Sequence, residues 1–214
     1  MRTLYSYFRS SAAYRVRIAL ALKELDFTMV PVHLLKNGGE QHAPDYLHLN
    51  PEGLVPTLVE DGHTLTQSLA IIEYLDETHG PRSLLPETPL ERARVRSLAQ
   101  QVACDIHPLN NLRVLKWFAH EMNIDKLVRD TWYRHWIQVG FDALEASLQS
   151  DATGQCCHGD TPGLADCCLI PQVYNAGRYE MDLAQWPTIQ RIAEHCNSLP
   201  AFQSARPEAQ ADAE

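Results

Sequence analysis

The chain has 214 residues, of which 45% are hydrophobic and 21% charged, a balance typical of a folded globular protein with a substantial core. A formal net charge of −9 argues against a partner held through phosphate groups, so we expect no nucleic acid. No apolar run is long enough to cross a bilayer and no signal-peptide pattern opens the chain, so we expect no membrane association.

The six cysteines include two adjacent pairs, Cys156-Cys157 and Cys167-Cys168, and no C-x-x-C spacing. This pattern matches neither a structural zinc site nor the disulfide framework of a small secreted domain. We therefore expect reduced thiols, a cytoplasmic location and no bound metal.

Short extended runs alternate with helical patterns over residues 1–82. The predicted strands and helices follow in the order β-α-β-α-β-β-α: a strand at 3–7, a helix from Ser10 to about 24, a strand at 27–32, a loop with a short helix at 36–49, a hairpin at 54–66 and a helix from Ser68 to 79. Pro31 favours an edge position for the second strand, and Asp61-Gly62 is a strong hairpin signal. This order is the thioredoxin-like arrangement.

Strand signals are absent after a Pro-containing linker at residues 79–89. Helices are predicted at 90–120 with a break at Pro108, at 125–149, at 164–179 with a bend or break near Pro171, and from Pro187 to 196. We expect the end of the chain after Arg206 to be frayed. The fold class is therefore α/β plus all-α: a thioredoxin-like domain over 1–82 followed by a helical bundle over 88–214.

Two serines, Ser10 and Ser11, stand where the first helix must begin. One hydroxyl can cap the helix by accepting a backbone hydrogen bond. The other faces a site where free N–H groups and the positive helix end favour an anion. A strand followed by a serine and a helix N-terminus can hold a thiolate that the protein does not itself supply.

Three separated motifs carry a resemblance that covers nearly the whole chain. They are Phe8-Arg9-Ser10-Ser11 with Arg15 to Leu20, the stretch Asp105 to Leu115, and Leu164-Ala165-Asp166 with Pro171-Gln172-Val173 and Asn175 to Tyr179. This combination resembles the zeta class of the cytosolic glutathione transferases, which includes bacterial maleylacetoacetate and maleylpyruvate isomerases. The chain departs from the family pattern at Ala12, where cysteine is usual, and at Gly163, where serine or threonine is usual.

The resemblance implies the glutathione transferase fold, glutathione as cofactor and a homodimer. The implied activity is cis–trans isomerisation of a maleyl-type acid by reversible thiolate addition, a step of aromatic amino-acid breakdown. Maleylpyruvate isomerisation and glutathione transfer to α-halo acids are open alternatives. A non-catalytic glutathione-fold binding protein is an alternative of another class, and it would be marked by loss of the serine or of the arginines.

The resemblance also assigns roles to particular residues. Ser10, Ser11 and Arg9 are the predicted catalytic residues, with Ser10 holding the glutathione thiolate. The predicted glutathione contacts are Ser10, Val55, Pro56, Gln67, Ser68 and Asn110. Sequence alone favours a trans Val55-Pro56 bond, whereas the resemblance implies a cis bond that turns the Val55 amide and carbonyl toward the tripeptide.

The second substrate is expected to be a small dicarboxylate held by Arg9, Arg113 and Arg178, because arginine binds carboxylates through two parallel hydrogen bonds. Arg15 and Arg17 are interpreted as structural or surface charges. Asp105 and His107 are too few to form a metal site.

Overall fold

The computed structural model describes residues 1–80 and 82–214; Pro81, part of the predicted linker, lies outside the described residues. The chain forms two compact units. Unit 1 contains Met1–Leu84 together with Asn197–Glu214, and unit 2 contains Leu85–Cys196. Among the helices of the described residues, none combines the length and the apolarity needed to cross a bilayer.

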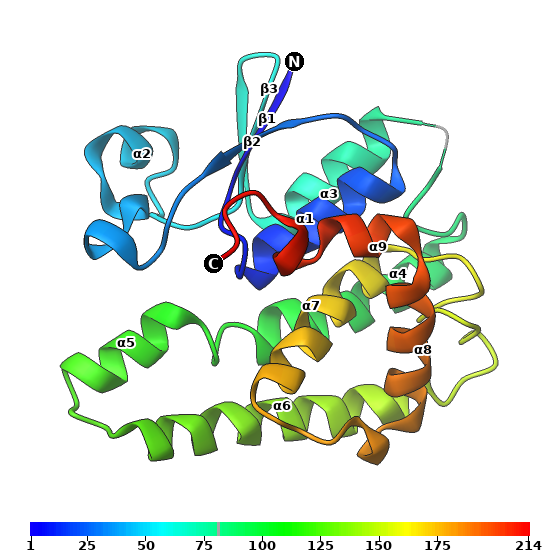
Figure 1. The fold of residues 1–214 in the computed structure, drawn as a ribbon. Coiled ribbons are helices and arrows are strands. Elements are labelled where there is room, and N and C mark those ends of the chain that lie inside the picture. Colours follow the sequence, from blue (N-terminus) through cyan, green and yellow to red (C-terminus); the bar gives the residue numbers. More distant parts are fainter. Residues whose placement is uncertain (81) are drawn as a thin grey trace. The chain divides into compact units, whose positions relative to one another are not determined.

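Unit 1 is built on a four-stranded sheet with the order β2-β1-β3-β4 (Figure 1). Its strands are β1 (Arg2–Ser6), β2 (Thr28–Pro31), β3 (Thr57–Glu60) and β4 (His63–Thr66). β2 runs parallel to β1, whereas β3 is antiparallel to both β1 and β4. The predicted edge position of Pro31 is confirmed. The predicted hairpin is also confirmed, since Asp61 and Gly62 both adopt the positive φ that a tight β-turn requires.

The helices of unit 1 complete the predicted order. They are α1 (Ser11–Leu22), the single-turn helices η1 (Lys36–Gly38) and η2 (Glu40–His42), α2 (Pro44–Leu49) and α3 (Ser68–Thr78). α1 packs against α3 and is buried on almost every side, as expected from apolar residues on more than one of its faces. The thioredoxin-like arrangement is confirmed.

The end of the chain differs from the sequence expectation. Helix α9 (Pro200–Ala205) packs against α1, and η5 (Pro207–Ala209) continues the tail. The buried Arg17 donates a hydrogen bond from Nε to the Ala205 carbonyl at 2.9 Å. The prediction of a frayed end after Arg206 was wrong, because Pro207 is buried and the Asp212 carboxylate accepts a hydrogen bond from the Phe8 amide at 3.0 Å. Residues 197–214 thus belong to unit 1, whereas the sequence placed them with 88–214.

Unit 2 is helical in the part of it that the structure describes, apart from one isolated bridge between Thr153 and Gly159. Its elements are α4 (Pro89–Gln100), the π-helical segment η3 (Gln101–Ile106), α5 (Leu112–His120), α6 (Lys126–Leu148), α7 (Leu164–Arg178), η4 (Leu183–Gln185) and α8 (Pro187–Ser198), the last ending in unit 1. α4 packs against α7, and Phe141 meets Trp186 edge to face at 5.1 Å between ring centroids.

Two prolines act differently on these helices. The helix that begins at Pro89 ends before Pro108, as predicted, and passes first through the π-helical segment. In contrast, α7 runs through Pro171 without a break. Pro171 is buried, so packing along α7 compensates for the backbone hydrogen bond that a proline cannot donate.

Candidate active site

Ser10 is the N-cap of α1. Its backbone is extended, at φ −68° and ψ 116°, and its Oγ accepts a hydrogen bond from the Ala13 amide at 3.2 Å. A hydroxyl has one proton and two lone pairs, so the Ser10 proton can still be donated to a ligand. Ser10 is partly exposed and Ser11 is buried. The capping serine is thus also the accessible one, whereas the sequence assigned these tasks to different hydroxyls.

Arg9 lies beside this helix start and is held by aromatic neighbours. Its guanidinium carbon stands 5.3 Å from the centroid of the Phe8 ring, and Nη2 donates to the Tyr7 hydroxyl at 3.3 Å. These contacts fix a positive charge next to Ser10 while leaving the side chain partly exposed. The arrangement suits an anionic substrate.

The Val55-Pro56 peptide bond is cis, as the resemblance implied. Among the residues that the structure describes, neither the amide nor the carbonyl of Val55 has a hydrogen-bond partner. An extended peptide can therefore pair with both groups, in the manner of an added strand.

The turn before Val55 is held by two buried side chains that the sequence analysis missed. The Tyr46 hydroxyl donates to the Leu54 carbonyl at 2.6 Å, and the Asn50 amide donates to the same oxygen at 2.8 Å. Both side chains also reach the Thr57 hydroxyl. Burial raises the pKa of Tyr46, which keeps its proton available for donation. The Asn50-Pro51 dipeptide was the signal for a turn here.

Gln67 and Ser68 form the start of α3. Gln67 has φ of +66°, a left-handed conformation that is strained for a residue with a side chain, and strain of this kind clusters at ligand sites. Its amide donates to both carboxylate oxygens of Glu52, at 2.9 and 3.0 Å. The Ser68 hydroxyl accepts from Nη1 of the buried Arg15 at 3.2 Å. The helix N-terminus and the Arg15 charge together favour a carboxylate ligand.

Arg15 was interpreted from the sequence as a structural or surface charge. In the structure it is 3% exposed and contacts a predicted site residue. Its place in the first motif was the only available signal, because its partner lies 53 residues away.

The predicted residues of unit 2 gather in part around a tyrosine pair. Tyr133 and Tyr179 stack with their ring centroids 3.8 Å apart. Asn110 is buried and donates to the Tyr133 carbonyl at 3.1 Å, while its own Oδ1 finds no partner among the described residues. Burial raises the pKa of Tyr133, and the positive charge of the exposed Arg178 opposes this effect.

Arg113 is exposed near the N-terminus of α5, where its backbone amide binds the Asn111 side chain at 3.0 Å. Its own side chain makes no polar contact with Asn110 or Arg178 in the described part of the chain. Of the three unit 2 residues named from the sequence, Asn110 contacts Tyr133 and Arg178 acts on it through its charge, whereas Arg113 does neither within the described residues.

Comparison with known proteins places this site in a family. Residues 2–77 match the glutathione S-transferase N-terminal domain. A probable maleylacetoacetate isomerase of Vibrio cholerae is 50% identical over 98% of this chain and 97% of its own length. The holo structure of a bacterial zeta-class maleyl pyruvate isomerase superposes with a TM-score of 0.96 at 43% identity, covering 99% of this chain and 100% of that one.

The chain belongs to the zeta-class glutathione transferase family. A third relative, maleylacetoacetate isomerase from Anaeromyxobacter dehalogenans, is 41% identical with a TM-score of 0.86, covering 100% of this chain and 98% of that one. Its structure holds dicarboxyethyl glutathione and citrate in the active site. Glutathione is the cofactor of this family.

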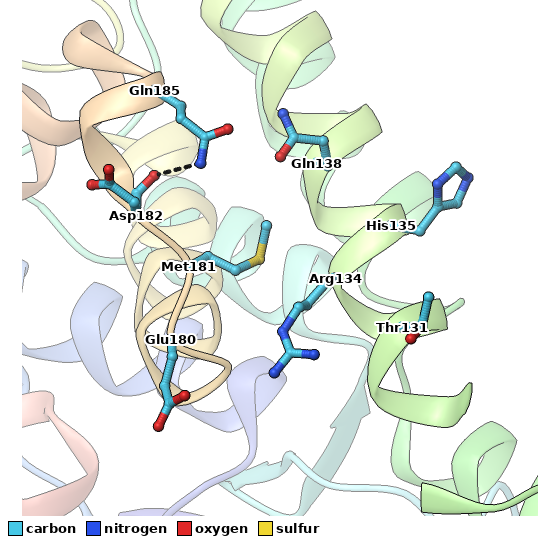
Figure 2. Close-up of a pocket in the computed structure, with 8 residues that line it drawn as sticks. All are labelled: Thr131, Arg134, His135, Gln138, Glu180, Met181, Asp182 and Gln185. Carbon is cyan, nitrogen blue, oxygen red and sulfur yellow. Dashed lines mark hydrogen bonds between the residues drawn. The ribbon is translucent and has the colours of Figure 1, made fainter. Parts of the chain in front are cut away.

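A cavity of about 550 Å³ in unit 2 lies beside the zeta-class motif that ends at Tyr179 (Figure 2). Arg134 projects from α6 into it, toward the segment that carries Glu180 and Met181, and its Nε donates to the Tyr179 carbonyl at 3.0 Å. His135 points away from this segment in the same view. None of the predicted site residues lines this cavity, which is formed by Thr131, Arg134, His135, Gln138, Glu180, Met181, Asp182 and Gln185.

A second feature of unit 2 is a buried group of Cys156, Asp166 and Cys196, whose potential ligand atoms lie within 4.8 Å of one another. The Asp166 carboxylate accepts hydrogen bonds from the amides of Cys157 at 2.8 Å and Gly163 at 2.9 Å. The contact with Gly163 is the predicted half of a capping box at the start of α7, and it is confirmed. These bonds give Asp166 a structural task in holding the start of α7.

Proposed function

We propose that this protein catalyses the glutathione-dependent cis–trans isomerisation of a maleyl-type acid, converting maleylacetoacetate to fumarylacetoacetate. The observation that carries the proposal is the Ser10 hydroxyl, which caps α1, remains partly exposed and keeps a proton to donate. The family supplies the cofactor, and the names of the relatives supply the substrate class.

Glutathione binding follows from the groups in unit 1. The amide and carbonyl of Val55 pair with the backbone of the tripeptide, and the N-terminus of α3 at Ser68 receives the α-carboxylate of its γ-glutamyl end. Gln67 holds Glu52 at the edge of this carboxylate site. The resemblance assigns a further glutathione contact to Asn110, and this stays a prediction.

Ser10 acts on the sulfur atom. A free thiol has a pKa of about 8.5, and hydrogen-bond donors at a helix N-terminus lower it, so that glutathione is poised as thiolate near neutral pH. The Ser10 hydroxyl donates its proton to the sulfur, and the positive end of the α1 dipole adds to the stabilisation of the thiolate. Ser11, predicted as a catalytic residue, is the first residue of α1 and is buried.

The reaction balances without a second reactant. The thiolate forms a carbon–sulfur bond to one carbon of the cis double bond, and the π electrons move into the conjugated carbonyl to give an enolate. Rotation about the new single bond follows. The enolate then re-forms the double bond in the trans geometry and expels the thiolate, which regenerates glutathione. Arg9, beside Ser10, binds a carboxylate of the substrate and stabilises the negative charge of the enolate. The resemblance assigns further carboxylate contacts to Arg113 and Arg178, and these stay predictions.

The ligand in one relative supports this route. A dicarboxyethyl thioether is what addition of a thiol to the double bond of a four-carbon dicarboxylate yields, and such a glutathione adduct occupies the active site of the Anaeromyxobacter dehalogenans protein. Maleylpyruvate is the second candidate substrate, since the zeta-class structure with a TM-score of 0.96 has that name. Comparison of kcat/KM for the two acids, with and without glutathione, decides between them.

Replacement of Ser10 tests the assigned chemistry. For Ser10→Ala we expect kcat to fall by about 10- to 100-fold, the effect of losing one hydrogen bond to a charged group. Ser10→Thr keeps the hydroxyl and the helix cap, so it should retain most of the activity. The assay is absorbance-followed isomerisation at saturating glutathione. Full activity of Ser10→Ala would exclude the role of Ser10.

Halide release from α-halo acids in the presence of glutathione tests the transferase alternative. We also propose, from the resemblance, that the protein is a homodimer located in the cytoplasm and that it serves aromatic amino-acid breakdown. Light scattering on the purified protein tests the dimer, and a mass of 24.2 kDa would contradict it.

A further inference from the structure

The C-terminal tail reaches the loop that precedes Ser10. In this loop, residues 7–10 make a turn closed by the Ser10 amide and the Tyr7 carbonyl at 2.9 Å. The amide of Phe8, within that turn, donates to Oδ2 of Asp212 at 3.0 Å. A residue 204 positions away in the sequence thus binds the backbone two residues before the proposed catalytic serine.

Arg17 binds the same turn from α1. Its Nη2 donates to the Phe8 carbonyl at 2.9 Å, and its Nη1 donates to the Ser6 hydroxyl at 3.1 Å. Arg17 is 1% exposed. The N–H and the C=O of Phe8 are therefore both bound by charged side chains, which hold the turn more firmly than water could.

The two side chains of this clamp are also coupled by charge. Burial lowers the pKa of Arg17 to about 10, and the negative charge of Asp212 counteracts this effect. A buried cation is costly unless an opposite charge lies close to it. The Tyr14 side chain and the negative charge of Asp212 both counteract this cost, and Asp212 also accepts the hydrogen bond from Phe8.

The tail is anchored on both sides of Asp212. Before it, Pro207 is buried, and the Gln210 amide donates to the Ser204 and Arg206 carbonyls at 2.9 Å each. After it, the Glu214 carboxylate contacts the Lys36 ammonium group. Asp212 is thus held at a fixed place, which a positioning role requires.

We propose that Asp212 is a positioning residue of the isomerase: with Arg17 it clamps the Phe8 peptide and so places the Ser10 hydroxyl against the glutathione sulfur. The inference rests on the proposed role of Ser10. Asp212 touches neither the sulfur nor the substrate and acts through the turn alone.

Two substitutions at this position separate the hydrogen bond from general effects on folding. Asp212→Ala removes the acceptor for the Phe8 amide, and we expect kcat to fall about tenfold, as for loss of one charge-assisted hydrogen bond. The KM for glutathione should stay within about twofold, since Val55 and Ser68 bind the tripeptide independently.

Asp212→Asn keeps an acceptor oxygen at the same place and should restore kcat to within about threefold of the unmodified protein. Ala211→Ser, at an exposed tail position next to Asp212, is the control and should leave kcat unchanged.

A double-mutant cycle and amide exchange complete the test. If Asp212 acts through Ser10, Asp212→Ala should cost little in a Ser10→Ala background. Hydrogen exchange at the Phe8 amide, followed by NMR, should accelerate in Asp212→Ala and not in Asp212→Asn. Unchanged kcat in Asp212→Ala, or an equal tenfold loss with and without the Ser10 hydroxyl, would overturn the proposal. Full activity of Ser10→Ala would instead refute the proposed function, and the exchange data would still report whether the clamp exists.

Discussion

The six cysteines differ sharply in their surroundings. Cys104 is exposed, and the other five are buried. Burial raises the pKa of Cys157, and a hydrogen bond with Cys156 together with burial raises that of Cys196. Since the thiolate is the reactive form, we expect one cysteine to react with Ellman's reagent in the native protein and all six to react in denaturant. Cys104→Ala should abolish the reaction of the native protein with the reagent. Any thiol that still reacts rapidly in that variant would contradict the burial of the other five cysteines.

Single residues were predictable where their signal is local. Ser10 and the Asp61-Gly62 turn follow from helix-capping and turn preferences that involve only neighbours in sequence. Arg15 and Arg17 were interpreted as structural or surface charges, and both are buried. Arg15 binds Ser68, 53 residues away, and Arg17 binds Ala205, 188 residues away, as well as Ser6 and Phe8 near the start of the chain. None of these contacts follows a periodic pattern in the sequence. The burial of a charge is decided by tertiary contacts.

At the scale of elements, α6 and the π-helical segment η3 approach each other at a glycine. A Cβ on Gly140 would stand 2.3 Å from Cγ1 and Cδ1 of Ile106, a side chain that is itself buried. We expect Gly140→Ala to destabilise the protein by about 1–3 kcal/mol, the usual cost of overpacking a core. The free energy of unfolding in urea measures this effect.

A matched control lies on α7. A Cβ on Gly177 would meet nothing within 4 Å, so Gly177→Ala should stabilise the protein by about 0.5–1 kcal/mol through helix propensity alone. Shortening the opposing side chain in Gly140→Ala/Ile106→Val should recover part of the loss. Equal effects of alanine at the two glycines would show that α6 and η3 do not pack as closely as the structure places them.

The elements themselves were largely predictable, because apolar periodicity and punctuation by proline and glycine are strong over long segments. The continuity of α7 through Pro171 was not, since a proline signals a break and only the surrounding core shows that the helix survives. The π-helical segment also leaves no sequence pattern, because it differs from an α-helix only in that its hydrogen bonds join residues five positions apart in place of four.

For the whole molecule, the order of elements and the family were predictable, and the path of the last 18 residues was not. The residues after Arg206 have the Ala- and Glu-rich composition of a solvated end, yet the whole segment 197–214 joins unit 1. Their attachment depends on Arg17 and the Phe8 amide, which lie near the other end of the chain. Hydrogen bonds between a single side chain and a backbone group far away in the sequence leave no periodic pattern, so the sequence does not predict them.

The stability of the molecule toward acid is tied to Glu60. Its carboxylate lies 2.5 Å from Nη2 of Arg2 and 3.2 Å from Nε2 of His79. Burial raises the pKa of Glu60, but the hydrogen bond from His79 and the charge and hydrogen bond of Arg2 outweigh it and leave the pKa below its ordinary value. A lowered native pKa stabilises the fold above the unfolded pKa of about 4.3, and this contribution is lost as pH falls through the native pKa.

The variant Glu60→Gln should therefore reduce the free energy of unfolding by about 1–3 kcal/mol at pH 7, the range for hydrogen bonds to a charged group. The difference from the unmodified protein should shrink as the pH falls below about 4, because protonation removes the same charge from Glu60. Urea unfolding at pH 7, 5, 4 and 3 measures this difference in the free energy of unfolding. Glu77 is exposed on α3, so the control variant Glu77→Gln should have the same free energy of unfolding as the unmodified protein at every pH. If the difference in the free energy of unfolding for Glu60→Gln stays constant down to pH 3, packing and not the charge explains the contribution of Glu60 to stability.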